Sequence, residues 1–258
     1  MGAQFSQFFP PKPTFTEADV ESQDSKVFLI TGGASGIGYE LAKILYQKNA
    51  RVYIAGRSEE RARQAIRDLK RPIKASADAF KAKESAASSA NGGQPGSVRI
   101  VWTSSQMVEL SAPSQGLIMS EVRAPPRDKA RNYVNSKTGN VFLALEFARR
   151  TGSSRSIISV CQNPGAAATK LFRHTPWLNY VAFPLLHKAS LAALTALYAG
   201  LSKDITLDAN GCYIVPWGRI HKNLREDLVE AMIPAGEGGS GRATEFWDFC
   251  VEMTRDYC

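Results

Sequence analysis

The sequence has few cysteines and histidines for its length, and they do not form a recognisable metal-binding pattern. Only four cysteines and three histidines occur among 258 residues. No two cysteines stand in a C-x-x-C pattern and the histidines are scattered, so no metal site is predicted. We expect Cys161, Cys212, Cys250 and Cys258 to be reduced thiols, as in most intracellular proteins.

Secretion signals and long uninterrupted apolar runs are also lacking. The N-terminus has no basic segment followed by an apolar one, as a secretory signal would. The most apolar long stretch, residues 177–201, is interrupted by a proline, a histidine and a lysine, so we expect a loop and a core helix there. The chain is expected to be cytoplasmic. The start MGAQFS resembles an N-myristoylation signal at Gly2, and one acyl chain would give only weak, reversible membrane contact.

Acidic residues are outnumbered by basic ones. The chain has 32 Lys and Arg against 24 Asp and Glu, a formal net charge of +8. A basic balance favours anionic partners such as a phosphorylated cofactor or an acidic membrane surface, although a solvated basic surface is the simpler interpretation. Basic residues are not interleaved with aromatic ones in a stripe, so no nucleic-acid partner is expected.

What the chain does contain is a regular alternation of apolar runs and helical periodicity. Pro10, Pro11 and Pro13 argue against helix in residues 1–25, which we expect to be an arm packed on the domain. Residues 26–258 are expected to form one domain, since 44% hydrophobic residues can fill a sizeable core. Strands are predicted at residues 26–31, 50–55, 98–104, 156–161 and 212–216. Helices are predicted after the first strand, after Ser58, and at residues 71–85, 129–150, 185–202 and the C-terminus. The alternation predicts an α/β fold, a Rossmann-like doubly wound parallel sheet of about five strands.

A glycine-rich turn, TGGASGIG at residues 31–38, lies between the first strand and its helix. In this context Gly32 permits a tight turn, Gly36 lets the backbone approach a pyrophosphate, and Gly38 lets helix and strand pack closely. The N-terminus of the helix would then face the phosphate charge. A tight turn without a ligand is the alternative. The predicted cofactor-binding residues of this turn are Thr31, Gly32, Ser35, Gly36, Ile37 and Gly38.

The second strand is followed by Arg57 and Ser58, where an NAD site usually places an acidic residue for the ribose 2′-hydroxyl. A cation at this position favours the 2′-phosphate of NADP instead. Arg57 and Ser58 therefore join the predicted cofactor-binding residues. A solvated surface arginine is the alternative interpretation.

The sequence YVNSK places Tyr133 and Lys137 four residues apart, on one face of a predicted helix. A lysine close to a phenol lowers the phenol pKa and lets the tyrosine exchange a proton near neutral pH. Ser105 ends the third predicted strand and would hold a substrate oxygen. Taken alone, this spacing is common by chance in ordinary helices.

In this order, these motifs resemble the short-chain dehydrogenases/reductases. The segment NPG at residues 163–165, with Thr169, extends the resemblance, and the arm and the segment GCYIVPWGR resemble fungal members of the retinol-dehydrogenase-like branch. The resemblance implies NADP(H) as cofactor and Tyr133 as the general acid/base. It also implies that Lys137 orients the ribose and tunes Tyr133, that Ser105 positions the substrate oxygen, and that Pro164, Gly165 and Thr169 line the cofactor site.

One region departs from the family pattern. Residues 58–97, about 40 in number, must hold everything between Arg57 and the third predicted strand. After one ordinary helix the remainder cannot hold two further strand–helix units, since each crossover needs roughly 30 residues. We therefore predict that the adenine-contacting strand, the Asn-Asn-Ala-Gly strand and the helix after it are missing. In the family that helix carries a catalytic Asn and part of the subunit interface.

The missing Asn-Asn-Ala-Gly strand normally separates the glycine-loop strand from the strand that carries the catalytic serine. Those two strands must then either pair directly or leave a gap. Direct pairing would move the Tyr133 side of the site by about 4.8 Å, one strand spacing. A misplacement of about 1 Å can already slow catalysis about 100-fold, so ordinary hydride transfer is in doubt and NADP(H) binding could be lost with it.

Three functions remain open at this point. The chain is an enzyme that keeps only acid–base chemistry on a small carbonyl or phenol, for isomerisation, dehydration or cyclisation. It is alternatively an NADP(H)-dependent oxidoreductase, a ketone reductase or alcohol dehydrogenase with a rearranged pocket. It is, third, a non-catalytic binding protein or an inert truncated product.

The substrate and the assembly are predicted only by class. Phe172, Trp177, Tyr180 and Phe183 lie where the family keeps its substrate loop and would suit an apolar or aromatic small molecule. Packing of this loop onto the core explains the same aromatic residues equally well. Without the interface helix we expect a monomer or an atypical dimer rather than the usual tetramer.

Overall fold

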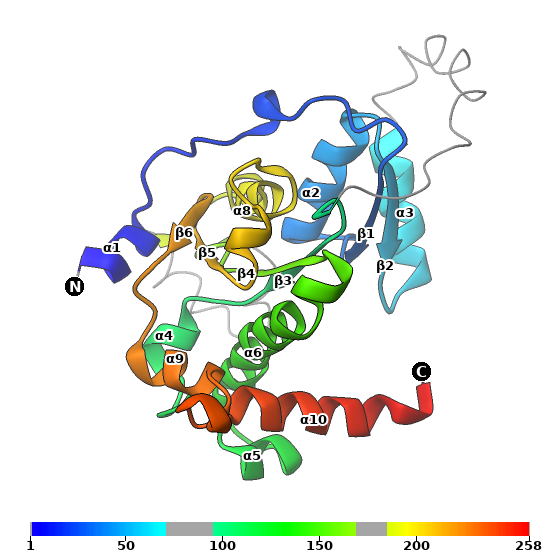
Figure 1. Cartoon of the computed structure of the whole chain (residues 1–258). Coiled ribbons are helices and arrows are strands. Elements are labelled where there is room, and N and C mark those ends of the chain that lie inside the picture. The colour runs from blue at the N-terminus through cyan, green and yellow to red at the C-terminus, as the bar shows by residue number, and fades with distance from the viewer. Residues whose placement is uncertain (1, 71–94, 169–184, 258) are drawn as a thin grey trace.

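The computed structural model describes residues 2–70, 95–168 and 185–257, and Figure 1 shows how their helices and strands are arranged. The strands are β1 (Val27–Thr31), β2 (Arg51–Ala55), β3 (Arg99–Thr103), β4 (Ile158–Gln162), β5 (Tyr213–Val215) and β6 (Arg219–His221). The helices are α1 (Gly2–Phe8), α2 (Gly36–Gln47), α3 (Glu59–Lys70), α4 (Met107–Ser111), α5 (Met119–Arg123), α6 (Lys129–Arg155), α8 (Ala189–Leu201), α9 (Glu226–Met232) and α10 (Arg242–Thr254). The predicted helix at 71–85, Thr169 and the four loop aromatics lie outside the described residues.

Mixed helices and parallel strands confirm the Rossmann-like α/β class, and all five predicted strands are present. The sixth strand, β6, was not predicted and pairs antiparallel with β5. The short segment Pro216–Gly218 separates them, and Gly218 has the positive φ of +89° that a tight reversal needs. β6 therefore adds an antiparallel edge to the parallel strands β3, β4 and β5.

The strands do not form one continuous sheet. β1 pairs with β2 in a two-stranded sheet, and the remaining strands form a second sheet in the order β3-β4-β5-β6. Within the described ranges no strand pairs with the free edge of β1 or of β3. Among the described residues β1 and β3 therefore do not pair, and the alternative of direct pairing between them is wrong.

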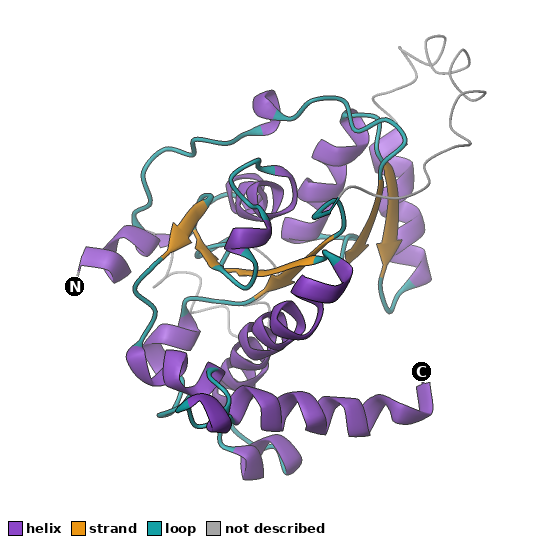
Figure 2. Cartoon of the chain, in the orientation of Figure 1, coloured by secondary structure: helices purple, strands orange, loops and turns teal. Residues whose placement is uncertain are grey.

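The two sheets are held together by helix packing. α8 lies against α2 and also contacts β3, β4 and β5, so it covers the second sheet while holding the first (Figure 2). Leu194 and Leu197 of α8 share one apolar cluster with Ile30 of β1 and Leu45 of α2. Burial of these apolar side chains, rather than strand pairing, holds the first sheet to the second.

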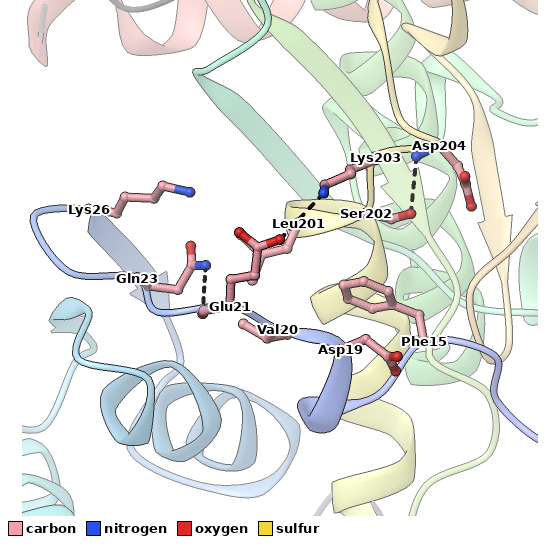
Figure 3. A pocket seen from close by; sticks show the side chains of 10 residues that line it. All are labelled: Phe15, Asp19, Val20, Glu21, Gln23, Lys26, Leu201, Ser202, Lys203 and Asp204. Atoms are coloured by element: carbon pink, nitrogen blue, oxygen red, sulfur yellow. Dashed lines mark hydrogen bonds and ion pairs between the residues drawn. The ribbon is translucent and has the colours of Figure 1, made fainter.

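A polar cavity of about 350 Å³ opens near the start of β1 (Figure 3). Lys26, which precedes β1, lines one part of it, and the segment after α8 lines another. In that segment the Ser202 carbonyl accepts a hydrogen bond of 3.0 Å from Arg99 at the start of β3. The cavity therefore lies at the amino end of the gap between the two sheets. Glu21 of the arm faces Lys203 across it at 3.4 Å.

The N-terminal arm is not free of helix, contrary to the prediction from its prolines. α1 occupies the residues before Pro10, so the prolines exclude helix only from the segment that follows it. A seven-residue helix is too short to be stable alone, so contacts with the rest of the chain must hold it. Gln7 of this helix is completely buried. In the described part of the chain, no helix has the length and apolar character needed to cross a membrane.

Candidate active site

The glycine turn has the geometry of an anion cradle. Gly32 and Gly36 have positive φ values of +71° and +58°, and the Gly32 amide donates to the Ala55 carbonyl at 2.8 Å. A Cβ atom at Gly38 would lie 2.7 Å from the Gly32 carbonyl oxygen, so only glycine fits there. The turn thereby brings the N-terminus of α2 against the end of β1, where its free amides can meet a phosphate.

The other predicted residues of this region lie around the same edge. Ser35 precedes α2 in extended conformation and its side chain makes no cap hydrogen bond, while Ile37 is half-buried in the first turn of α2. Arg57 is exposed just beyond β2. Ser58 accepts a hydrogen bond of 3.4 Å from the Arg61 amide and so begins α3 as the sequence predicts. These positions suit the pyrophosphate and 2′-phosphate end of a dinucleotide.

The Tyr133–Lys137 pair lies on α6, whose first turn is capped by Asp128. The Asp128 side chain accepts hydrogen bonds from the Ala130 and Arg131 amides at 2.8 and 3.3 Å. Lys137 Nζ lies 5.7 Å from the centre of the Tyr133 ring. The structure therefore places the lysine charge beside the tyrosine, as the four-residue spacing predicts.

Lys137 is anchored to the end of β3. Its Nζ donates to the Thr103 carbonyl at 3.2 Å, and the Asn140 side chain donates to the same oxygen at 2.8 Å. The buried Ser104 hydroxyl donates in turn to the Lys137 carbonyl at 2.9 Å. Burial lowers the pKa of Lys137 below its ordinary value. These contacts fix α6 against β3, whose other edge pairs with no strand in the part of the chain that the structure describes.

Ser105 lies beside this pair, in the turn between β3 and α4. Its hydroxyl accepts a hydrogen bond of 3.3 Å from the Met107 amide, and its carbonyl accepts one of 3.2 Å from the Tyr213 hydroxyl. Burial raises the pKa of Tyr213 well above its usual value, and the nearby Cys161 and Glu109 add smaller upward contributions. Tyr213 is thus a neutral donor that supports Ser105, a role that the sequence did not indicate.

The Asn163–Pro164–Gly165 turn follows β4 directly. The Asn163 side-chain oxygen accepts a hydrogen bond of 2.9 Å from the Gly165 amide. Gly165 has a φ of +79°, and a Cβ atom there would lie 3.0 Å from the Pro216 ring. Pro164 is buried. The turn is therefore held in one conformation by its own asparagine and by the β5–β6 connection.

A chain of buried polar groups near this turn was not predicted. The Gln7 side chain donates to Glu109 at 2.7 Å, and Glu109 also lies 3.0 Å from the His221 ring nitrogen. Burial pushes the pKa of Glu109 upward, but the hydrogen bonds from His221 and Gln7 outweigh it and leave that pKa below its ordinary value. These residues come from α1, α4 and β6 and share no sequence motif.

The site residues thus fall into two groups on separate sheets. The glycine turn and Arg57 lie at the carboxyl ends of β1 and β2, whereas Ser105, Tyr133, Lys137 and the 163–165 turn surround the carboxyl ends of β3 and β4. The first group fits the phosphates of NADP(H). Within the described ranges no strand pairs between the two groups, so the described residues fit only the phosphate end of the cofactor.

A glycine turn after the first strand of a parallel sheet, with a Tyr–Lys pair on a later helix, defines a Rossmann-like enzyme class that works with nicotinamide dinucleotides. Residues 26–91 match a family model described as short chain dehydrogenase. The chain is 35% identical to the short-chain dehydrogenase/reductase iacJ of Pestalotiopsis fici, with 95% of each chain covered. It is 31% identical to a short-chain dehydrogenase/reductase of Phomopsis amygdali, covering 98% of this chain and 96% of that protein. The chain belongs to the short-chain dehydrogenase/reductase family.

Solved structures support the fold. An uncharacterised protein from Mycobacterium paratuberculosis superimposes with a TM-score of 0.61 at 19% identity, covering 93% of this chain and 97% of that one. A short-chain dehydrogenase/reductase from Brucella melitensis gives 0.53 at 14% identity, covering 79% of this chain and all of the other.

The alignment with the Pestalotiopsis fici relative also measures what this chain lacks. It extends over 316 positions, whereas this chain has 258 residues in all. At least 58 aligned positions, 316 less 258, therefore have no counterpart here. Both chains are covered almost from end to end, so most of this shortfall is internal. The difference agrees with a missing stretch of strand and helix between Arg57 and β3.

Proposed function

We propose that this chain is an enzyme that performs acid–base chemistry on a carbonyl or phenol of a small molecule, without hydride transfer. Tyr133 exchanges the proton, Lys137 tunes it, and Ser105 holds the substrate oxygen. The reaction class is isomerisation, dehydration or cyclisation. One observation carries the proposal. Lys137 is hydrogen-bonded to the Thr103 carbonyl at the end of β3, and among the described strands the sheet of β3 does not pair with the strand that precedes the glycine turn.

The proposed chemistry needs only Ser105, Tyr133 and Lys137, which all lie around the sheet that contains β3 and β4. Lys137 Nζ lies 5.7 Å from the centre of the Tyr133 ring, so the lysine lies beside the group that would exchange the proton. Tyr133 can then accept a proton from the substrate and return it at another atom. Ser105 is held in place through Tyr213 and the Met107 amide, so a substrate oxygen would meet a fixed hydroxyl.

The substrate that we propose is a small apolar or aromatic molecule, on the strength of the aromatic residues at positions 172–183. We further propose that the protein is a monomer or an atypical dimer, because the sequence between Arg57 and β3 is too short to add the helix of the usual interface. Light scattering on the purified chain tests the second point, and a tetramer would contradict it.

Substitution of Tyr133 tests the proposed chemistry. Tyr133→Phe should lower the conversion of small ketones and phenols, assayed without added cofactor, by about 100-fold or more. Tyr53→Phe makes the same chemical change at an exposed position on β2 and should leave the rate unchanged. Equal rates in wild type and Tyr133→Phe would remove Tyr133 from the mechanism.

A second candidate, an NADP(H)-dependent oxidoreductase, is favoured by one feature. Because β1 and β3 do not pair, Tyr133 has not been drawn one strand spacing toward the glycine turn. Gly32, Gly36 and the N-terminus of α2 would hold the pyrophosphate, and Arg57 the 2′-phosphate. When bound, NADP(H) would supply the hydride.

Titration with NADPH separates the two candidates. Micromolar binding that is lost in Arg57→Ala but kept in Arg51→Ala, an exposed arginine at the other end of β2, would favour the oxidoreductase. A folded protein that binds no NADPH and still converts substrate would favour chemistry without hydride transfer.

A further inference from the structure

Gln7 of α1 joins two walls of the candidate site. Its side-chain nitrogen donates to Glu109 at 2.7 Å, and its side-chain oxygen accepts from the Asn163 side chain at 2.9 Å. The residue is completely buried although it lies in the N-terminal arm. Both ends of the side-chain amide therefore make hydrogen bonds inside the protein. One partner, Glu109, lies in α4 after β3, and the other, Asn163, directly follows β4.

One end of this bridge is firmly fixed. The Glu109 carboxylate also lies 3.0 Å from His221, and its carbonyl accepts a hydrogen bond of 3.2 Å from Arg225. The Glu109 and His221 side chains are 4% and 8% exposed, so this contact is shielded from water. Glu109, a residue of α4, is therefore held in place by contacts with β6 and with the segment before α9, and its carboxylate is a fixed acceptor for the Gln7 side chain.

The other end controls a turn of the site. The same Asn163 side chain that donates to Gln7 accepts from the Gly165 amide at 2.9 Å. Asn163 is 1% exposed, so loss of Gln7 would leave its side-chain nitrogen buried without this partner. An unpaired buried donor is costly, and Asn163 would be expected to reorient and release the Gly165 amide.

Further contacts show that α1 is held in a defined position. Arg219 donates to the Ser6 carbonyl at 2.7 Å, and the His187 ring lies 3.0 Å from the Phe8 carbonyl. Both partners of α1 lie beside the 163–165 turn, since Pro216 packs on Gly165 and the residues 166–168 pair with His187. α1 is therefore part of the wall around this end of the site.

We propose that Gln7 is a positioning residue, which holds Asn163 and through it the Pro164–Gly165 turn in the geometry that the site requires. The proposal extends the proposed function, because this turn lies beside Ser105 and Tyr133 at the carboxyl ends of β3 and β4. On this proposal, the N-terminal helix α1 contributes to the geometry of the active site.

The test compares Gln7→Leu with Ser6→Ala in the full chain. Gln7→Leu removes both hydrogen bonds of the bridge, whereas Ser6→Ala leaves the bridge intact and removes the 3.3 Å hydrogen bond from Arg219 to the neighbouring hydroxyl of α1. Exchange of the Gly165 amide, followed by NMR, should become about tenfold faster in Gln7→Leu and stay unchanged in Ser6→Ala. The Val160 amide in β4 should keep its protection in both. Unchanged Gly165 exchange, or equal loss at Val160, would overturn the proposal.

Gln7→Glu keeps the test decisive if Gln7→Leu does not fold. It places a second carboxylate against Glu109, with His221 and Arg225 on the far side of Glu109 and Arg219 on the neighbouring Ser6 as the other charged groups. Below about pH 5 one carboxyl of such a pair binds a proton and can donate again, so the protection factor of the Gly165 amide should rise as the pH falls. A protection factor independent of pH would count against the bridge.

Turnover separates this inference from the proposed function. In the cofactor-free assay, Gln7→Leu should be about tenfold slower than wild type and Ser6→Ala equal to it. Lost Gly165 protection with unchanged turnover would overturn the positioning role. If the wild type shows no turnover, the proposed function fails, while the exchange data still decide whether Gln7 holds the turn.

Discussion

The two halves of this molecule differ in how completely their sheets are covered. We call residues 27–70, with β1, β2, α2 and α3, the nucleotide half, and the remaining described elements from β3 onward the catalytic half. All five residues of β4 are buried in the catalytic half. In β1 of the nucleotide half, Val27 and Leu29 are 58% and 71% exposed. Apolar side chains on one face of β1 are thus open to solvent, whereas those of β4 are not.

The layers explain this difference. In the catalytic half, Trp102 of β3 packs toward α6 and Val101 toward α8, so both faces of the sheet are covered. In the nucleotide half, Phe28 and Ile30 face α2 and α8, and the alternate residues have no helix over them within the described ranges. The catalytic half is thus a complete layered unit, whereas the nucleotide half depends on α8 for its attachment.

The largest expected effect comes from breaking that attachment. Leu197→Ala removes a side chain that is 1% exposed and lies in the cluster shared by α8 and the nucleotide half. We expect the free energy of unfolding to fall by about 3 kcal/mol, the usual range for such a cavity. Because the contact joins the two halves, the nucleotide half should unfold at lower urea concentration than the catalytic half.

Two spectroscopic signals distinguish the halves. Trp102, Trp217 and Trp247 lie in the catalytic half and residues 27–70 contain no tryptophan, so fluorescence does not report the nucleotide half, while far-UV circular dichroism reports both halves. In Leu197→Ala the dichroism change should precede the fluorescence change. Leu228→Ala, an equally buried leucine on α9, should instead lower both transitions together. Coincident transitions in Leu197→Ala would show that α8 is not the joint between the halves.

Acid should weaken the catalytic half through its buried carboxylates. Burial pushes the pKa of Glu146 upward, but hydrogen bonds from Thr244, Arg150 and Arg149 outweigh it, so the pKa lies below its ordinary value of 4.5. A carboxyl with a lowered pKa in the folded state adds stability above its unfolded-state pKa and loses it as the pH falls. The urea midpoint by tryptophan fluorescence should therefore drop as the pH falls below about 4.5.

Glu146→Gln provides the control for this pH dependence. The variant cannot lose a proton at this position, so it should be less stable than wild type at pH 7 and show a smaller further loss in acid. The same slope with pH in both proteins would mean that other carboxyls account for the acid effect.

The local parts of this structure were predictable, and the long-range ones were not. The glycine turn, the Tyr133–Lys137 pair and the shortage of residues before β3 are all visible within short stretches of sequence. Whether β1 and β3 pair or stay apart depends on how α8 packs against α2. These two helices are about 150 residues apart in the sequence, so no local sequence pattern predicts their contact.

The α1 helix and the Gln7 bridge show the same limit. Gln7 and Glu109 are 102 residues apart, and Gln7 and Asn163 are 156 apart. The three prolines after α1 led us to predict an arm without helix. That prediction failed because helix propensity carries no information on the tertiary contacts that hold these seven residues in place. The Asn163 turn was predicted as a motif, but its partner was not.

A moderate effect is expected at Gly165 of the catalytic half. Gly165→Ala forces a side chain into a φ of +79° and against Pro216 at 3.0 Å, which should cost about 1–2 kcal/mol of unfolding free energy. Gly200→Ala in α8, where nothing lies within 4 Å of the new methyl group, should stabilise by about 0.5–1 kcal/mol. Urea denaturation measures both, and effects of the same sign would contradict the expected geometry.

The smallest effect on stability should come from the bare face of the nucleotide half. Leu29→Lys replaces a side chain that is 71% exposed, so the free energy of unfolding should change by no more than about 0.5 kcal/mol. Val160→Lys, at a completely buried position of β4, should prevent folding. Because a charge beside an open strand edge discourages pairing with another chain, Leu29→Lys should also reduce light scattering on concentration or mild heating. A large loss of stability in Leu29→Lys would mean that this face is covered in solution, and the contrast between the two halves would then disappear.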